Sequence, residues 1–382
     1  MNYVIFLVFV FFCLFLSIDE LVEELRKIQE KGDQALMSKE LNTVLKPLLQ
    51  SGEEPSLFTL YQALQIEYEM GRVLSLVKEY CLQTVSEHNK IVGMEFLYMN
   101  DFLKELEQAI EDNLQSQQSS NQNWAKVYDL ILKRRRQQID PFEILKRLRK
   151  IKTEDNALLT MISFMKIYVH LDLTQYNEVG NYIDDITEGM EAFEDPLFKK
   201  YYQERLDDFW MFYYLFRNEL ILCRKHGFRL LNQSKNPYKL STTHIVIGHS
   251  YARENYEQSI YHFYRAKDLA VTFNQQMAKQ IINQNIPFVS ALNGIYEGIT
   301  TDDEAEQAHL AIAAGRADEA IKTLEGFTNR TPFQEYYLGK AKQSEFHLKL
   351  AYRQFKQSGN FFIAKLPLLE LERLKEKGAA SF

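Results

Sequence analysis

The sequence predicts an all-α protein in which a short helix-turn-helix precedes a superhelix of paired helical repeats. Among its 382 residues there are only 15 Gly and 8 Pro, and runs of β-branched residues are few, which favours helices throughout. Hydrophobic residues make up 46% and charged residues 25%, values that suit a globular chain and exclude disorder over most of it. The formal net charge of −7 gives no overall positive field, so any contact with nucleic acid has to be local.

The chain opens on an uncharged apolar segment at residues 3–16. This segment is shorter than the roughly 20 residues that a membrane-spanning helix needs, and neither a preceding Lys or Arg nor a small-residue cleavage site marks it as a secretory signal. Three interpretations stay open: a segment unrelated to the working domain, a weak membrane anchor, or a helix docked on the core. We expect residues 1–17 to form a segment of their own, with membrane contact open but not favoured.

Four short helices are expected between residues 18 and 70, with Asp33 and Asn42 as N-caps of the second and third. Only a short break separates those two helices, as in a repressor-type helix-turn-helix. Pro55 and Ser56 start the fourth helix, whose apolar face has the helical spacing of Leu57, Leu60, Tyr61 and Leu64. These features predict a helix-turn-helix DNA-binding domain, with the cap of a plain helical bundle as the alternative.

In such a domain the contacts to DNA would come from polar side chains of the second and third helices, namely Gln34, Lys39, Asn42, Thr43, Lys46 and Gln50. Two observations weigh against DNA binding. Residues 17–70 contain five Lys or Arg but eleven Asp or Glu, a charge balance that suits phosphate poorly. Pro47 also lies inside the expected recognition helix, where proline disturbs helical structure. A denser basic cluster begins with Lys133, Arg134, Arg135 and Arg136 and continues over residues 146–152. This cluster either supplies phosphate contacts or forms a solvated helix face.

Residues 71–154 are expected to form a helical linker region, in which the polar, uncharged run at residues 115–123 is a loop. From residue 155 to 382, small and large side chains recur weakly at helical spacing. Gly248 is followed by Ser259, Phe263 and Ala266, and Gly339 by Ala351 and Phe355. Small residues at this spacing let two helices approach closely, as in tetratricopeptide (TPR) repeats. The pattern predicts a TPR-like superhelix, whose concave face suits an extended peptide.

No catalytic or cofactor-binding pattern emerges from the sequence. GHSYA at residues 248–252 approximates a nucleophile elbow but lies on an expected repeat helix, and no phosphate-binding loop is present. Cys13, Cys81 and Cys223 lack metal-ligand spacing and are expected to be buried and reduced. The aromatic run FWMFYYLF at residues 209–216 favours core packing. We expect a cytoplasmic binding protein that is not an enzyme and carries no cofactor.

Several segments resemble the arbitrium peptide receptors (AimR) of temperate phages and related mobile elements of Bacillus. The most telling are IGHSYARENYEQS, DEAEQAHLAIAAG, EYYLGKA and FFIAKLPLLELERL, and the similarity runs from about residue 34 to 374. The resemblance implies a homodimer with a helix-turn-helix and a TPR-like superhelix. It also implies that a peptide of about six residues binds in the superhelix and uncouples the receptor from operator DNA, which shifts the phage from lysis to lysogeny.

The resemblance further implies a set of peptide-binding residues, namely Arg205, Phe212, Lys239, His249, Asn329, Arg330 and Asn360. Lys239 matches a basic residue that would hold a peptide carboxylate. Asn360 stands where the family has an acidic partner for a peptide arginine, so we expect either a different ligand or a decayed site. Two other functions stay open: a TPR protein that binds a protein partner without DNA, and a membrane-tethered adaptor.

Overall fold

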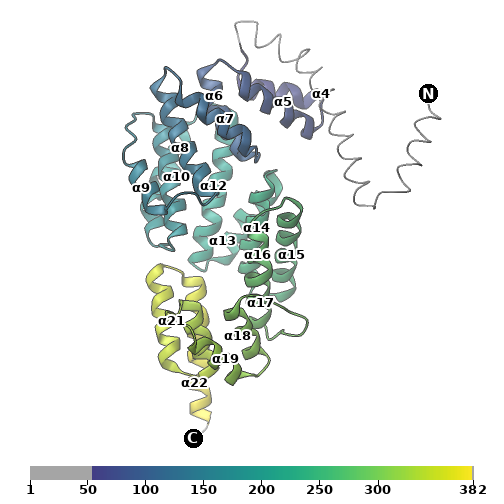
Figure 1. Cartoon of the computed structure of the whole chain (residues 1–382), viewed down its shortest axis with the longest axis vertical. Helices are drawn as coiled ribbons and strands as arrows, with labels where there is room; N and C mark the ends of the chain where they lie inside the picture. The colour runs from purple at the N-terminus through teal and green to yellow at the C-terminus, as the bar shows by residue number, and fades with distance from the viewer. Residues whose placement is uncertain (1–53, 381–382) are drawn as a thin grey trace, which may run out of the picture. The chain divides into compact units, whose positions relative to one another are not determined.

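The computed structural model describes residues 54–380, with side chains up to residue 377. The apolar start, the first three expected helices and the DNA contacts predicted from Gln34 to Gln50 lie outside these residues. Residues 54–380 form helices and turns without a strand (Figure 1), which confirms the predicted all-α class. Within the same range, no helix combines the length and the apolar character needed to cross a membrane.

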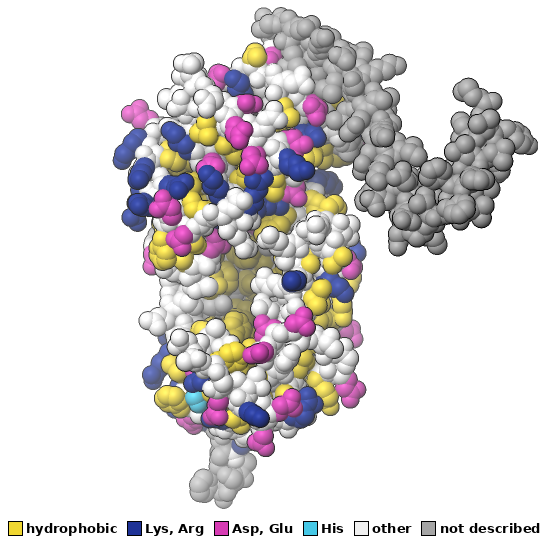
Figure 2. Space-filling view, viewed as in Figure 1, with side chains coloured by type: hydrophobic (Ala, Val, Ile, Leu, Met, Phe, Trp, Pro, Cys, Tyr) yellow, Lys and Arg dark blue, Asp and Glu magenta, His cyan; other side chains and the backbone are white. Residues whose placement is uncertain are grey.

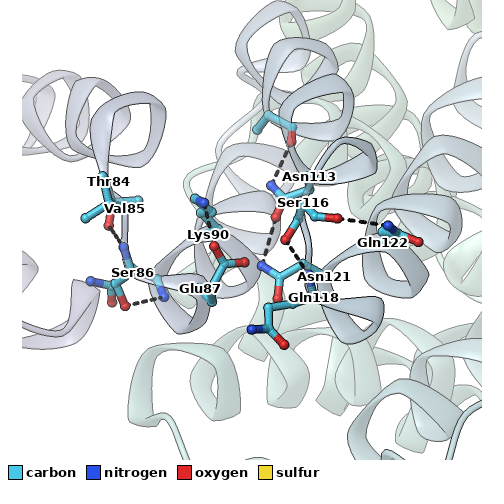
Figure 3. Close-up of polar contacts among 12 residues, drawn as sticks. Thr84, Val85, Ser86, Glu87, Lys90, Asn113, Ser116, Gln118, Asn121 and Gln122 are labelled. Carbon is cyan, nitrogen blue, oxygen red and sulfur yellow. Dashed lines mark hydrogen bonds and ion pairs between the residues drawn. The ribbon is translucent and has the colours of Figure 1, made fainter.

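The chain divides after Gly93 into two compact units. In the first unit, α4 (Leu57–Glu67) starts as predicted, because the Ser56 hydroxyl accepts a hydrogen bond from the backbone N–H of Thr59 at 3.1 Å. The predicted apolar face is buried, at Leu57, Leu60, Tyr61 and Leu64. Helix α5 (Met70–Gln83) packs beside α4, and α6 (Glu87–Met99) follows the turn drawn in Figure 3. The domain boundaries expected at residues 17, 70 and 154 stay predictions.

The second unit consists of helices that pack against their neighbours along the chain (Figure 1). In order these are α7 (Leu103–Leu114), α8 (Ser119–Arg135), α9 (Pro141–Leu148), α10 (Asn156–Asp172), η2 (Glu178–Tyr182), α11 (Ile183–Glu188), η3 (Gly189–Ala192), α12 (Pro196–Phe216), α13 (Leu220–Gln233), α14 (Pro237–Tyr251), α15 (Tyr256–Thr272), α16 (Met277–Gln280), η4 (Ile281–Asn285), α17 (Ile286–Leu292), α18 (Glu304–Ala313), α19 (Ala317–Glu325), α20 (Pro332–Lys342), α21 (Glu345–Ser358) and α22 (Phe361–Ala380).

Small residues bring the paired helices together where the sequence predicts it. A Cβ atom on Gly248 of α14 would lie 3.1 Å from the ring of Phe263 on α15, and the Ser259 hydroxyl donates to the Gly248 carbonyl at 2.7 Å. Ala266 and Ala351 are fully buried. These contacts confirm that the weak sequence repeat marks helix pairs. They also place GHSYA on the last turn of a helix, which is not the strand-to-helix turn of a nucleophile elbow.

Gly339 gives the sharpest test of this close packing. Its substitution Gly339→Ala is expected to lower the free energy of unfolding by about 1 to 3 kcal/mol, because overpacking forces neighbours apart. The added Cβ would lie 2.9 Å from the backbone nitrogen of Leu348, an atom that cannot rotate away. Gly71→Ala is the matched control, since nothing lies within 4 Å of its added Cβ. Urea unfolding of both variants measures the effect; equal stability of the two would contradict the packing argument.

The polar run at residues 115–123 is only partly a loop, because α8 begins within it at Ser119. Polar side chains in and beside this run form hydrogen bonds at the α7–α8 connection (Figure 3). Asn121 Nδ2 donates to Asn113 Oδ1 at 3.0 Å, and Gln122 Nε2 donates to the Ser116 carbonyl at 2.8 Å. Local amide hydrogen bonds thus give this stretch a helical start that its composition does not reveal.

Candidate ligand-binding site

Two adjoining cavities lie inside the second unit, on either side of a stacked ring pair. The rings of Tyr176 and Phe216 line both cavities, and their centroids are 3.8 Å apart. One cavity, here called the central cavity, has a volume of about 460 Å³. The other, here called the basic cavity, measures about 350 Å³. Figure 2 shows this part of the molecule hollowed, with hydrophobic side chains in its depth.

The central cavity is lined by aromatic and amide side chains from six or more separate helices and turns, among them His249, Gln284, Asn285, Phe333 and Tyr337. Residues Ile281–Asn285 form a π-helix between α16 and α17. A π-helix inserts an extra residue into a turn and often occurs at functional sites. Here the insertion is accompanied by three amide side chains on the cavity wall, those of Gln280, Gln284 and Asn285.

His249 contributes a neutral imidazole to the central cavity. Burial lowers the pKa of His249 to about 4, so the ring carries no charge near neutral pH. Asn285 Nδ2 lies 3.0 Å from His249 Nε2 and donates a hydrogen bond to it. The ring also packs edge-on against Phe263, with centroids 5.0 Å apart. This wall of the cavity is therefore uncharged and offers rings and amides to a ligand.

The lining of the central cavity also contains carboxyl groups. Burial is the main cause that raises the pKa of Glu306 to about 8; the nearby Asp303 acts in the same direction, and a hydrogen bond from Tyr337 Oη at 2.6 Å opposes the shift. Asp303 Oδ2 accepts from Gln284 Nε2 at 3.0 Å, while its Oδ1 caps α18. Glu306 is therefore protonated near neutral pH, and a cationic group placed beside it would favour its ionised form.

In the basic cavity, the position of the Arg205 side chain is fixed by an ion pair with Glu95. Its Nε and Nη2 atoms donate to the two carboxylate oxygens of Glu95 at 2.8 and 2.7 Å. Tyr128 Oη donates to the same carboxylate at 2.8 Å, and all three side chains are buried. The guanidinium also lies over the ring of Tyr98, 4.8 Å from its centroid. Bidentate pairing of this kind sets the geometry of the cavity floor.

Three further cations line the basic cavity, and two of them are paired. Arg134 binds both oxygens of Asp172 at 2.6 and 2.7 Å, and Arg135 Nη2 donates to Asp101 Oδ1 at 2.5 Å. Lys239, on the first turn of α14, makes no ion pair within 4.0 Å among residues 54–377, although its charge opposes the rise that burial causes in the pKa of Glu204 and of Asp208, which also lines this cavity. Among the described cations of this cavity, its ammonium is therefore the one that no carboxylate holds in a direct ion pair.

The structure brings five of the seven predicted peptide-binding residues to the two cavities. Arg205, Phe212 and Lys239 line the basic cavity, and His249 and Asn360 line the central cavity. The Asn360 side chain is partly used within the fold, since its Oδ1 accepts from the backbone N–H of Ile363. Asn329 and Arg330 lie in the turn before α20, outside both linings, and Arg330 pairs with Glu335 at 2.7 Å. A role for these residues in ligand binding stays a prediction.

The basic run predicted to assist DNA binding is paired with acids throughout. Lys133 binds Asp129 at 2.7 Å, Arg136 binds both oxygens of Glu107 at 2.9 and 3.0 Å, and Arg134 and Arg135 bind Asp172 and Asp101. The aromatic run at residues 209–216 contributes some side chains to the core and others to the cavities. Phe209, Met211 and Leu215 are buried, as expected for core packing, while Phe212 and Phe216 line the cavities.

Sequence reasoning missed Glu306, Asn285 and Tyr176. Glu306 stands in an acidic stretch at the start of a helix, where carboxylates usually face solvent. Tyr176 reaches the cavities because its turn is tied to a distant one: its backbone N–H donates to the Ser358 carbonyl at 2.9 Å. No sequence signal marks that contact. Between residues 54 and 377, no cluster of His, Cys, Asp or Glu is suited to hold a metal ion.

The sequence matches a known family over most of its length. The family model described as AimR transcriptional regulator-like matches residues 73–373. The chain is 24% identical to the AimR transcriptional regulator of Bacillus phage SPbeta, over 80% of this chain and 82% of that protein. It is 21% identical to the AimR transcriptional regulator of Bacillus phage phi3T, over 78% of this chain and 81% of that one. These relatives are named as transcriptional regulators and not as enzymes.

The fold is also similar to solved structures. The structure of phAimR-Ligand superposes with a TM-score of 0.70 at 20% identity, covering 84% of this chain and 98% of that one. The structure of SeMet-phAimR superposes with a TM-score of 0.61 at 19% identity, covering 92% and 96%. At these identities the likeness shows the helical-repeat fold alone. Together with the family match over residues 73–373, it shows that the chain belongs to the AimR transcriptional regulator-like family.

Proposed function

We propose that this protein is a cytoplasmic, peptide-responsive transcription regulator that controls the choice between lysis and lysogeny. The observation that carries the proposal is the pair of adjoining cavities: one contains the Lys239 ammonium, which makes no direct ion pair among the described residues, and the other contains the buried carboxyl of Glu306. Their lining of rings and amides suits a short peptide, since rings bind side chains and amides bind the main chain. A related fold solved as phAimR-Ligand supports the same assignment.

The ligand that best fits the two cavities is a peptide of about six residues. Its C-terminal carboxylate would pair with Lys239 in the basic cavity, and its remaining residues would pass the stacked Tyr176 and Phe216 rings into the central cavity. Asn360 offers no carboxylate there, so a cationic peptide residue would have to meet Glu306 instead. The ligand of this protein is therefore proposed to differ from a peptide selected by an acid at residue 360.

DNA binding and dimerisation complete the proposal. Gln34, Lys39, Asn42, Thr43, Lys46 and Gln50 would contact an operator from a helix-turn-helix, aided by a basic surface of the superhelix. The protein would act as a homodimer, so that two half-sites are bound together. A peptide that binds the DNA-competent arrangement less tightly than the other shifts the protein away from DNA.

The full-length protein and DNA from its own gene neighbourhood provide the test. Fluorescence anisotropy is measured with and without short synthetic peptides encoded beside the gene. We expect a salt-sensitive, sequence-specific complex that one peptide releases. A peptide that binds the protein while no DNA is bound would reject the DNA role and favour a protein partner, an alternative that the acidic N-terminal region and Pro47 support.

The contact of Lys239 with a peptide carboxylate has its own test. Lys239→Met is expected to weaken binding of the active peptide about 10-fold to 150-fold, the equivalent of one charge-assisted contact. Amidating the C-terminus of the peptide should weaken binding to the wild type by a similar factor and add little to the loss in the variant. Isothermal titration calorimetry of the four combinations gives the coupling.

Lys235→Met is the control for that cycle, because Lys235 is exposed just before α14 and lines neither cavity. It should bind both peptides as the wild type does. Independent, additive losses from Lys239→Met and from amidation would show that the carboxylate binds elsewhere.

A further inference from the structure

We infer that the surface formed by α9, the turn after it and Lys126 of α8 binds the phosphate backbone of duplex DNA. This α9 basic surface consists of Lys126, Lys146, Arg147, Arg149, Lys150 and Lys152. The inference rests on the proposed function in that it takes DNA as a partner of the protein. It assigns the contacts that do not depend on base sequence to residues other than the run Lys133–Arg136.

The run at residues 133–136 is charge-matched, with one acid for each cation. Its partners are Asp129, Asp172, Asp101 and Glu107, all within hydrogen-bond distance. A cation that is paired with a carboxylate adds little positive potential to the surface. Two of the four cations, Arg134 and Arg135, also line the basic cavity. A phosphate would have to displace an existing partner to bind them.

The α9 basic surface lacks this matching. Lys146 and Arg147 have side chains 66% and 47% exposed and share one acid, Glu143. Arg149, Lys150 and Lys152 are exposed and make no ion pair within residues 54–377. Five cations thus fall in seven residues with no acid among them. Of the flanking acids, Asp140 and Asp155 cap helices, and Glu154 is exposed and makes no ion pair within residues 54–377.

Local structure turns these cations outward together. Ile144 and Leu148 of α9 are buried, so the intervening residues 146 and 147 point away from the core. Asn123 joins the neighbouring helix to the turn: its Nδ2 donates to the Lys152 carbonyl at 3.0 Å and its Oδ1 accepts from Lys126 at 3.1 Å. Figure 2 shows Lys and Arg side chains gathered over the part of the molecule that Figure 1 labels α9.

The shape of this surface favours a duplex over a peptide. None of its residues lines a described cavity, so it offers no groove in which a peptide side chain could be buried. A phosphate backbone needs no groove, because closely spaced charges and released counterions supply the affinity. The chain belongs to a family of transcriptional regulators, which makes duplex DNA the polyanion to expect.

Salt-dependent DNA binding tests the inference. The triple variant Arg149→Gln, Lys150→Gln, Lys152→Gln of the full chain is compared with the wild type on labelled duplexes from the gene neighbourhood and of unrelated sequence. Each lost phosphate contact should reduce the slope of log K against log salt by about 0.9, so we expect a slope shallower by roughly 2 to 3. Affinity should fall about tenfold or more on both duplexes alike.

A second triple variant, Lys322→Gln, Arg353→Gln, Lys356→Gln, removes the same charge from exposed positions on α19 and α21 and should change the slope little. Unchanged affinity for the active peptide verifies that both variants are folded. If wild-type DNA binding is present and both triples shift it equally, the α9 basic surface has no special role and the inference is overturned, while the proposed function stands. If the wild type binds no DNA, the proposed function fails with it.

Discussion

Replacing Glu95 by Ala is expected to lower the free energy of unfolding by about 3 to 5 kcal/mol, the usual cost of leaving one partner of a buried ion pair alone. Arg205 would keep its charge at 1% exposure without the carboxylate that binds it in two places. Tyr128 would lose its hydrogen-bond acceptor at the same time. Urea unfolding followed by circular dichroism measures the loss.

The control for this prediction is Glu107→Ala. Glu107 also binds an arginine through both carboxylate oxygens, but its side chain is 51% exposed. Exposed pairs contribute little to stability, because water screens the charges. Comparable losses from the two substitutions would mean that burial does not set the strength of the pair with Arg205.

Stability should fall as the pH rises through the range in which Glu306 is protonated only in the folded protein. The pKa of Glu306 is raised to about 8 in the fold, mainly by burial, from the ordinary value of 4.5 for a glutamate. Its contribution is therefore fully present at pH values below the unfolded pKa and is lost as the pH rises through the folded pKa. Relative to Glu306→Gln, which stays neutral, the wild type should lose roughly 4 kcal/mol between pH 5 and pH 8.

Urea unfolding of the wild type and Glu306→Gln at several pH values measures this difference. Subtracting the variant removes the effect of other buried acids, such as Asp208, whose pKa is also raised by burial. Glu345→Gln provides the control, since Lys349 lowers the pKa of that exposed carboxyl. Parallel pH profiles for the wild type and Glu306→Gln would show that Glu306 is already ionised in the fold.

The helical repeats could be predicted because their cause is local in the sequence. After both Gly248 and Gly339 a small residue is followed four positions later by Phe, and the structure places the two glycines at close contacts between helices. The start and the buried face of α4 could likewise be predicted, from Ser56 and the apolar spacing after it. Such features depend on neighbours a few residues away, which a sequence displays directly.

The candidate site depends on contacts that the sequence does not display. The partners of the basic run, Asp101, Glu107 and Asp172, lie about 30 residues or more from the cations that they bind, so the run looked unpaired. Glu306 and Tyr176 are 130 residues apart in the sequence, and only the folded superhelix brings both to the wall of the central cavity. Lys239 and His249 were found because the family resemblance supplied their positions, not because their local sequence marks them.

A crystal structure of the full-length protein with the peptide that releases it from DNA tests the central claim most directly. We predict continuous peptide density through the central and basic cavities, past Tyr176 and Phe216, with the C-terminal carboxylate within hydrogen-bond distance of Lys239. Density for the peptide on the outer surface, with both cavities unchanged, would contradict the account.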